Sequence, residues 1–446
     1  MRKMNPPPSA KSILRLSAEE QAILQDEQNQ TLQEVQNDGE EIDRLVDTNT
    51  GLDDTVLIVS ETPEFGVVDR GLVDLVADTA AAGTDADPEQ IVATTEDGLA
   101  TESFVTNAME RLKKLWEKIR EHLNNTWKSL VNYLSSEKRQ LENVHKQAIE
   151  VEKFVEENQS ILTVEQVAQN VKDKLANHQF QFHGDLSLIS TMSGVPKDFE
   201  KQVINLSSYA QDLHLTIGKT LRNMCHEFEV VLSKFDGGKG QHEVPNLVGR
   251  FHKDFEVIGR SIGEIKDHDG MLRAHSKGPL LGHFDVELVD YKKDGESDPV
   301  RMLIDVSKAI MEVSHGGEKR QGEVPMPEEP MTPALANTIK RWTEFQLSGD
   351  AVNVENDLKE YGEKFTAKID HLMQAQEHVK VLEDEHNTYQ IINGLISVCR
   401  MLDKMIIEFT LKYTTAVRLI MQNALRYQLQ AAEERIRIHK EATASL

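Results

Sequence analysis

The chain has 446 residues and is strongly acidic, with 50 Lys and Arg against 75 Asp and Glu and a formal net charge of −25. A dedicated DNA-binding domain would carry a basic face, so this balance argues against that class. The only two cysteines are Cys225 and Cys399, which excludes a disulfide-stapled scaffold. No stretch reaches the ~18 apolar residues of a membrane-spanning helix, and we therefore expect a soluble chain.

The acidic residues are concentrated at the N-terminus. Residues 1–102 hold 23 Asp and Glu against 6 Lys and Arg, a net charge of −17, whereas the rest of the chain carries −8. Short apolar clusters among Asp, Thr, Gly and Ala cannot repay the entropy of ordering. We predict that residues 1–102 form an acidic, mostly disordered leader, with a helix over residues 17–36 as its one candidate element.

The pattern changes at Ser103, where apolar residues begin to recur at steps of three or four. This spacing predicts an amphipathic helix over residues 103–139, with a net charge of +4. Further helices are expected over residues 196–234, 245–265 and 298–313, the last one capped by Asp298 and Pro299. They would form a helical body over residues 103–316.

One segment of the body shows the period of two that is typical of a strand. In residues 278–292, Phe284, Val286 and Leu288 alternate with more polar positions, which predicts a short β segment or hairpin. Residues 317–333 hold four prolines and are predicted to be an extended linker.

Residues 334–446 are predicted to be long helix with a coiled-coil-like pattern. Apolar residues recur every seven positions over about five repeats and widen beyond a two-stranded seam, which favours burial on several sides. The seam residues are Ile392, Leu395, Cys399, Leu402, Ile406, Phe409, Tyr413, Ala416, Ile420 and Tyr427. The expected fold is therefore mainly α: an elongated helical bundle with long C-terminal helices and a short β-hairpin insert, after the disordered leader.

No motif in the chain predicts an enzyme, a cofactor site or a metal site. Gly218-Lys219-Thr220 resembles the end of a phosphate-binding loop, but position 213 is Leu213 instead of the required glycine. The histidines of the middle region, including His268, His275 and His283, lack the paired spacing of zinc motifs. We expect no catalytic residues and no cofactor.

The basic helix 103–139 has three interpretations. It is one member of a helical bundle with a solvated charged face, or it lies on a membrane surface through Trp116 and Trp127, or its cations contact nucleic-acid phosphates. Glutamates interspersed among the cations of this helix weaken the membrane and nucleic-acid interpretations. The residues proposed for interaction are Arg111, Lys113, Lys114, Trp116, Lys118, Arg120 and Trp127.

The boundary between leader and body coincides with the triplet Ala100-Thr101-Glu102, followed by Ser103. With this acidic leader and the helix around Trp116, the chain resembles the internal head proteins of phiKZ-like giant tailed phages. Members of that family carry an N-terminal propeptide, which the phage prohead protease removes after a small-X-Glu sequence. Similar triplets occur elsewhere in the chain, but Ala100-Thr101-Glu102 stands where nicking is physically easiest.

The resemblance implies a virion structural protein that is made in the host cytoplasm and packaged inside the phage head. Its partners would be other internal head proteins, the prohead protease and, in contact with the body, packaged DNA, with self-association through helices and no membrane. The alternative is a non-viral intracellular helical scaffold or adaptor that dimerises through its C-terminal heptads.

Overall fold

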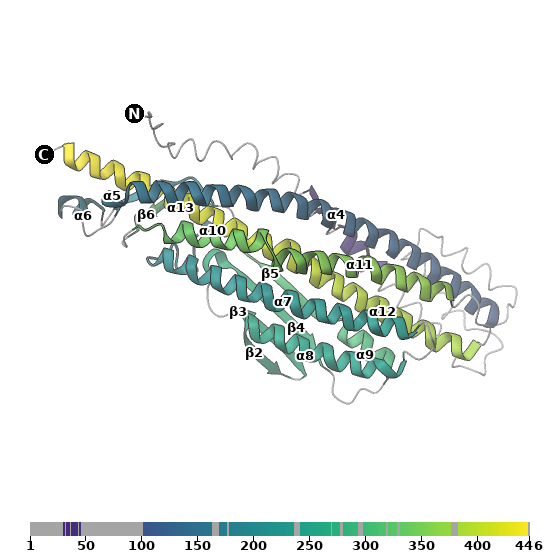
Figure 1. Cartoon of the computed structure of the whole chain (residues 1–446). Coiled ribbons are helices and arrows are strands. Elements are labelled where there is room, and N and C mark those ends of the chain that lie inside the picture. The colour runs from purple at the N-terminus through teal and green to yellow at the C-terminus, as the bar shows by residue number, and fades with distance from the viewer. Residues whose placement is uncertain are drawn as a thin grey trace.

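The computed structural model describes residues 101–162, 169–175, 178–235, 241–268, 270–276, 280–292, 298–317, 320–327, 331–375 and 382–444, and residues 30–45 apart from 32, 36 and 43. The described chain is mainly helical with a small antiparallel sheet, as the sequence predicts. Long helices lie side by side, and the sheet lies along one flank of this layer (Figure 1).

The basic helix of the sequence is the first part of α4 (Thr101–Glu157), which has 57 residues. Most of its apolar residues between Ile119 and Val155 share one face at helical spacing and are buried. This face packs against α10 (Ala334–Leu347), α11 (Asp350–Ala375) and α13 (Thr414–Ala444). The short helices α5 (Gln159–Leu162) and α6 (Gln169–Leu175) follow α4 and contact α13.

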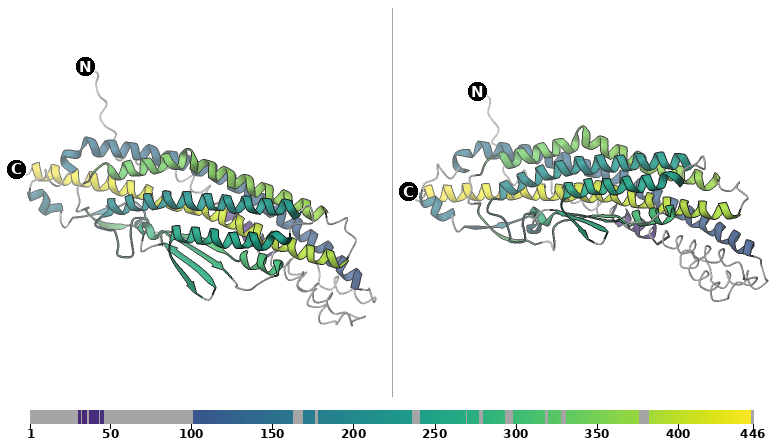
Figure 2. Two further views of the ribbon diagram at one scale, coloured as in Figure 1. Left: turned by 60° about the horizontal axis from the view of Figure 1, so that its bottom comes forward. Right: turned by 90° about the horizontal axis from the view of Figure 1, so that it is seen from below.

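A second group of helices lies beside the first (Figure 2). The helix α7 (Phe199–Phe235) packs against α8 (Val244–Ile262), α10 and α11. The short helix α9 (Pro299–Val306) packs against α8 and α12 (Leu382–Ile407). Asp298 caps α9 as expected, because its carboxylate accepts a hydrogen bond from the Val300 backbone N–H at 3.0 Å.

The heptad region forms one continuous run of helix at the centre of the molecule. It consists of α12, a π-helical turn η6 (Glu408–Tyr413) and α13. Residues from Ile391 to Ala432 are buried on nearly all sides, including every seam residue from Ile392 to Tyr427. The expected burial on several sides is confirmed, and the packing partners belong to the same chain.

The sheet has more strands than the sequence predicts. Four antiparallel strands stand in chain order, β2 (Gly263–His268), β3 (Met271–Ser276), β4 (Asp285–Tyr291) and β5 (Ile310–Ser314). Only β4 falls in the predicted β segment. The expectation of a helix through Val313 is wrong, because α9 ends at Val306 and Ile310–Ser314 pair with β4. The helix expected over 245–265 likewise ends at Ile262, where β2 begins.

A two-stranded ribbon crosses the region that the sequence predicts to be a linker. The strand β6 (Gly322–Pro325) pairs with β1 (Gln179–Phe182), and Phe182, Val324 and the adjacent Met326 are buried. The prolines do keep this segment extended. Nevertheless, β6 forms backbone hydrogen bonds with β1 of the body instead of spanning freely between two domains. Single 3₁₀ turns, η2 (Leu186–Leu188), η3 (Gln241–Glu243) and η4 (Leu281–His283), complete the described elements.

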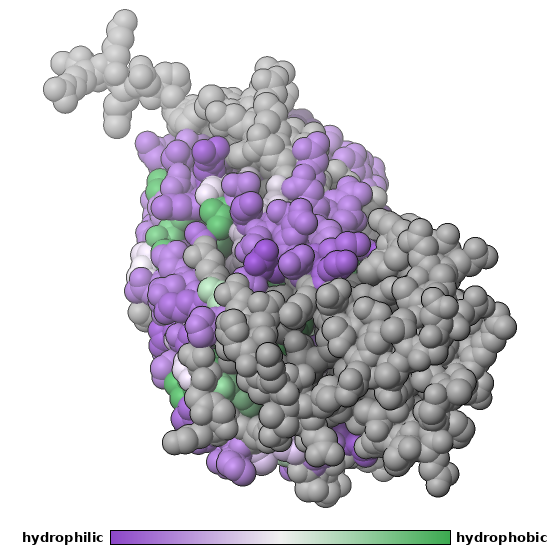
Figure 3. All heavy atoms as spheres, turned by 90° about the vertical axis from the view of Figure 1, so that its right-hand side faces the viewer, coloured by the Kyte–Doolittle hydropathy of each residue, from purple (hydrophilic) through white to green (hydrophobic). Residues whose placement is uncertain are grey.

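The described part of the leader is helical, with Val35, Ile42 and Leu45 inside the same hydrophobic core as the body. The other residues expected to be disordered, and most of the helix expected at 17–36, lie outside the described residues. At the end of the molecule on the right of Figure 1, the described surface is mostly hydrophilic (Figure 3).

Candidate functional site

The predicted cleavage junction lies at the start of α4. Thr101, Glu102 and Ser103 belong to its first turn, and Ala100 lies outside the described residues. A protease needs an extended substrate, so a cut after Glu102 requires this turn to open. The first four backbone N–H groups of a helix have no intrahelical partner, which makes the first turn the least costly one to unwind.

The basic part of α4 carries its described cations along a partly hollowed, polar face. Lys114 and Lys128 are exposed, and Lys118 and Arg120 are half-buried. The Arg120 guanidinium lies 3.2 Å from the Asp370 carboxylate of α11, so it already has an acidic partner. The side chains of Arg111, Lys113 and Trp116 lie outside the description. The residues that line the hollow are Lys114, Glu117, Lys118, Arg120, Glu121, Asn124, Asn125 and Lys128.

Trp127 does not belong to this polar face. It is 4% exposed and packs over Gly362 of α11, where an added Cβ would stand 1.8 Å from the indole ring. The glycine therefore makes the seat that the indole fills. Trp127 is therefore a core residue of the α4–α11 contact in this chain, and its proposed part in an interaction stays a prediction.

The leader segment, defined as the described residues between 30 and 45, lies beside α4 (Figure 1, purple). Asp38 Oδ1 lies 2.8 Å from His122 Nδ1, and Glu34 Oε2 lies 3.5 Å from Ser129 Oγ. The acidic leader thus contacts the helix that begins the body, a contact that charge counting alone did not predict. The available signal is the spacing of Val35, Ile42 and Leu45, which places them on one helical face.

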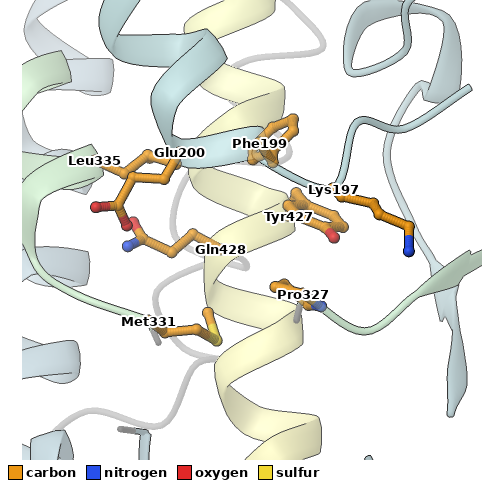
Figure 4. A pocket seen from close by; sticks show the side chains of 8 residues that line it. All are labelled: Lys197, Phe199, Glu200, Pro327, Met331, Leu335, Tyr427 and Gln428. Carbon is orange, nitrogen blue, oxygen red and sulfur yellow. The ribbon is translucent and has the colours of Figure 1, made fainter. Parts of the chain in front are cut away.

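A small cavity lies between α7, α13 and the segment after β6 (Figure 4). Its volume is about 30 Å³, and its walls are mostly apolar. Its lining residues are Lys197, Phe199, Glu200, Pro327, Met331, Leu335, Tyr427 and Gln428. The Tyr427 hydroxyl donates to the Pro325 carbonyl at 3.2 Å, and the Gln428 amide donates to the Thr332 carbonyl at 2.7 Å. This volume suits ordered water and is far below that of a cofactor site.

A buried polar cluster joins α4 to α13. Glu137 and Arg418, each 3% exposed, form an ion pair at 2.6 Å, and Thr415 donates to the second oxygen of Glu137. Tyr133 is bonded to Thr415, and burial raises the pKa of its phenol. Burial and the nearby Glu137 charge raise the pKa of Glu355 to about 8. Because Tyr133 and Glu137 of α4 pair with Thr415 and Arg418 of α13, these contacts fix the register of the two helices.

The segment Gly218-Lys219-Thr220 lies inside α7 and forms no loop. An added Cβ at Gly218 would stand 2.5 Å from Val354 Cγ1 and 3.2 Å from the Phe409 ring. This glycine therefore serves the close packing of α7 against α11 and η6. Its backbone N–H group is part of a helix and is not arranged to wrap a phosphate.

The histidines of the middle region are distributed over several elements. His252 pairs with the buried Asp290 at 2.7 Å, and His275 lies 3.7 Å from Glu287. His214 is fully buried against the rings of Phe409, Tyr413 and Phe345. Within the described residues, no group of three or more His, Cys, Asp or Glu side chains is arranged to hold a metal ion.

Comparison with known proteins gives no assignment: no protein-family model, no curated protein and no solved structure matches the chain. Among the described helices, none is both long enough and apolar enough to cross a membrane.

Proposed function

We propose that the chain is an internal head protein of a giant tailed phage, packaged in the capsid after its acidic leader is cut off behind Glu102. The proposal rests on one observation above all. The helical body starts at Thr101, at the boundary where the net charge of −17 on the leader gives way to a helix of net +4.

The leader charge gives the cut a physical purpose. An acidic leader repels DNA, and its removal leaves a body of −8 headed by a basic helix. Such a body would tolerate neighbouring DNA without binding it strongly. Its ordering in the head would come from contacts with other internal head proteins, and the proposal assigns it no catalysis and no cofactor. It would be made in the host cytoplasm and act inside the virion.

The charge pattern of α4 agrees with this role. Lys114 and Lys128 present exposed charges, but Glu117 and Glu121 stand among them on the same helix. Mixed charge of this kind favours a weak, adjustable contact over a dedicated DNA site. The alternative scaffold, which dimerises through its C-terminal heptads, is not favoured, because the seam residues are buried within the chain itself.

The first test is mass spectrometry of the N-terminal peptide in mature particles. A chain that starts at Ser103 is expected, and an intact Met1 or Arg2 would remove the main support. The variant Glu102→Gln keeps the size of the side chain but loses its charge, and should leave full-length chain in particles. Glu110→Gln, the same change at a position inside α4 and away from the junction, serves as the control and should be processed normally.

A further inference from the structure

The leader segment has the pattern of a docking helix. Val35, Gly39, Ile42 and Leu45 are buried and follow one another at steps of four, three and three, whereas Asn37 on the opposite side is exposed. Val35 is 3% exposed, and Ile42 and Leu45 are fully buried. An isolated helix of this length is marginal in water, so its stability comes from packing of the apolar face.

The polar contacts of the segment show where it is seated. Asp38 and Glu34 reach His122 and Ser129 on α4, as described above. On α12, Arg400 Nη2 donates a hydrogen bond of 3.0 Å to the Gly39 carbonyl. The leader segment therefore bridges α4 and α12, two helices of the body that are remote in sequence.

Gly39 permits a close approach of Arg400 to the leader segment. An added Cβ at this position would stand 3.0 Å from Arg400 Nη2, the group that bonds to the Gly39 carbonyl. Arg400 is 7% exposed, so the leader supplies a hydrogen-bond acceptor to a buried guanidinium. A charge-assisted hydrogen bond in such surroundings is stronger than an exposed one.

Electrostatics act in the same direction. The pKa of Glu41 is lowered, first by its hydrogen bond to Arg44 and further by the charges of Arg44, His122 and Lys118. His122 and Lys118 belong to α4, so the ionised Glu41 is favoured by the helix on which the leader lies. The acidic leader segment and the basic helix α4 are therefore complementary in charge.

We infer that the leader is a docked pro-segment: the leader segment bridges α4 and α12 and holds the leader on the body independently of the peptide bond at the junction. The docking stands on the contacts alone, and its consequence for maturation rests on the proposed function. Cutting behind Glu102 would then leave the leader bound. Maturation would take two steps, cleavage and release, and release would uncover the surfaces of α4 and α12 that the leader segment contacts.

The test uses the full chain with a protease recognition sequence inserted between Ala86 and Asp87. After cutting at that site, the N-terminal fragment of the otherwise unchanged protein should co-elute with the body in size exclusion. Ile42→Asp or Leu45→Asp places a carboxylate in the buried contact with the body and should weaken retention roughly 100-fold, so that the fragment elutes alone. Asn37→Asp adds the same charge on the exposed side and should leave co-elution unchanged.

Hydrogen exchange of the uncut chain gives a second measurement that needs no insertion. Amides of residues 37–45 should be protected in the unchanged protein and in Asn37→Asp, and should exchange freely in Ile42→Asp. The melting temperature of the body shows whether each variant is folded.

Separation of the unchanged fragment directly after cutting, or free exchange of these amides in the unchanged protein, would overturn the docking. Failure of the proposed function has a different signature, an uncut N-terminus in mature particles. A leader cut at Glu102 but never retained would support the function and refute the docking.

Discussion

His214 is the most unusual single residue of the core. It is fully buried, neither of its ring nitrogens has a hydrogen-bond partner among the described residues, and its ring centroid lies 4.8 Å from that of Phe409. Burial lowers its pKa from 6.5 to about 4. The ring is therefore neutral at physiological pH and packs as an apolar side chain.

This shift makes stability depend on pH. Between about pH 6.5 and 4, His214 is protonated in the unfolded chain but neutral in the folded protein. The free energy of unfolding therefore falls as the pH falls through this window. His214→Leu should remove that loss, worth roughly 3 kcal/mol at the acidic end. Urea unfolding at pH 7 and pH 4.5 measures the difference. His226→Leu, at an exposed position of the same helix, should keep the pH dependence of the unchanged protein. The same loss of stability between pH 7 and pH 4.5 in all three proteins would show that His214 is not the source of this loss.

His214 also shows a limit of single-residue interpretation. In the sequence it is one histidine among several in the middle region and fits the helical pattern of residues 196–234. Its partners Phe345, Phe409 and Tyr413 come from α10 and the π-helical turn. Only the assembled bundle decides whether such a histidine is a surface residue, a ligand or part of the core.

At the scale of elements, the contact between α4 and α11 depends on one glycine. Gly362 lies within a helix, where alanine is normally the better residue by about 1 kcal/mol. Here the added methyl group would meet the Trp127 ring at 1.8 Å. The packing cost should exceed the gain in helix propensity, because the indole is held on all sides in a buried contact.

Gly362→Ala should therefore destabilise the protein by about 1–3 kcal/mol, measured by thermal or urea unfolding. Trp127→Leu alone should also destabilise, since it leaves a cavity. The double variant should lose less than the sum of the two, because the alanine then occupies the space that the indole has left. Additive losses would show that Gly362 and Trp127 do not meet.

The elements differ in how well the sequence predicts them. α4, α7 and the C-terminal helix follow from apolar spacing, because each has a long face to bury. The strand β5 was expected to be helix, although Met311 and Val313 alternate with Glu312 in a period of two. β2 and β3 carry too few apolar residues to show the period-two pattern of a strand. In the structure β2 pairs with β3, β3 pairs with β4, and α8 packs against all three.

The spacing of Val35, Ile42 and Leu45 indicates an apolar helical face in the leader, but the sequence does not show which part of the body this face contacts. Asp38 meets a histidine 84 positions away, and the Gly39 carbonyl meets an arginine 361 positions away. The composition of the leader predicts that it has too few apolar residues to fold without the body. The surface that stabilises it belongs to the body and has no trace in the leader's own composition.

At the scale of the whole molecule, the C-terminal heptads are the feature that the sequence leaves most ambiguous. The same spacing suits a two-chain coiled coil and a helix surrounded by others of its own chain. The structure shows the second case, with Leu395, Leu402 and Phe409 all fully buried. The seam of this helix is buried by other helices of its own chain and contributes to the stability of that fold.

The two cases give opposite results when the protein concentration changes. Leu402→Ala should cost about 2–5 kcal/mol, because the cavity opens inside one chain. The melting temperatures of the unchanged protein and of the variant should both be independent of concentration from micromolar to hundreds of micromolar. Lys404→Ala, at an exposed position of the same helix, should change stability by less than about 0.5 kcal/mol. The opposite result would be a melting temperature of the unchanged protein that rises with concentration, and a smaller rise in Leu402→Ala. It would mean that the seam joins two chains, since mass action stabilises only an associating fold.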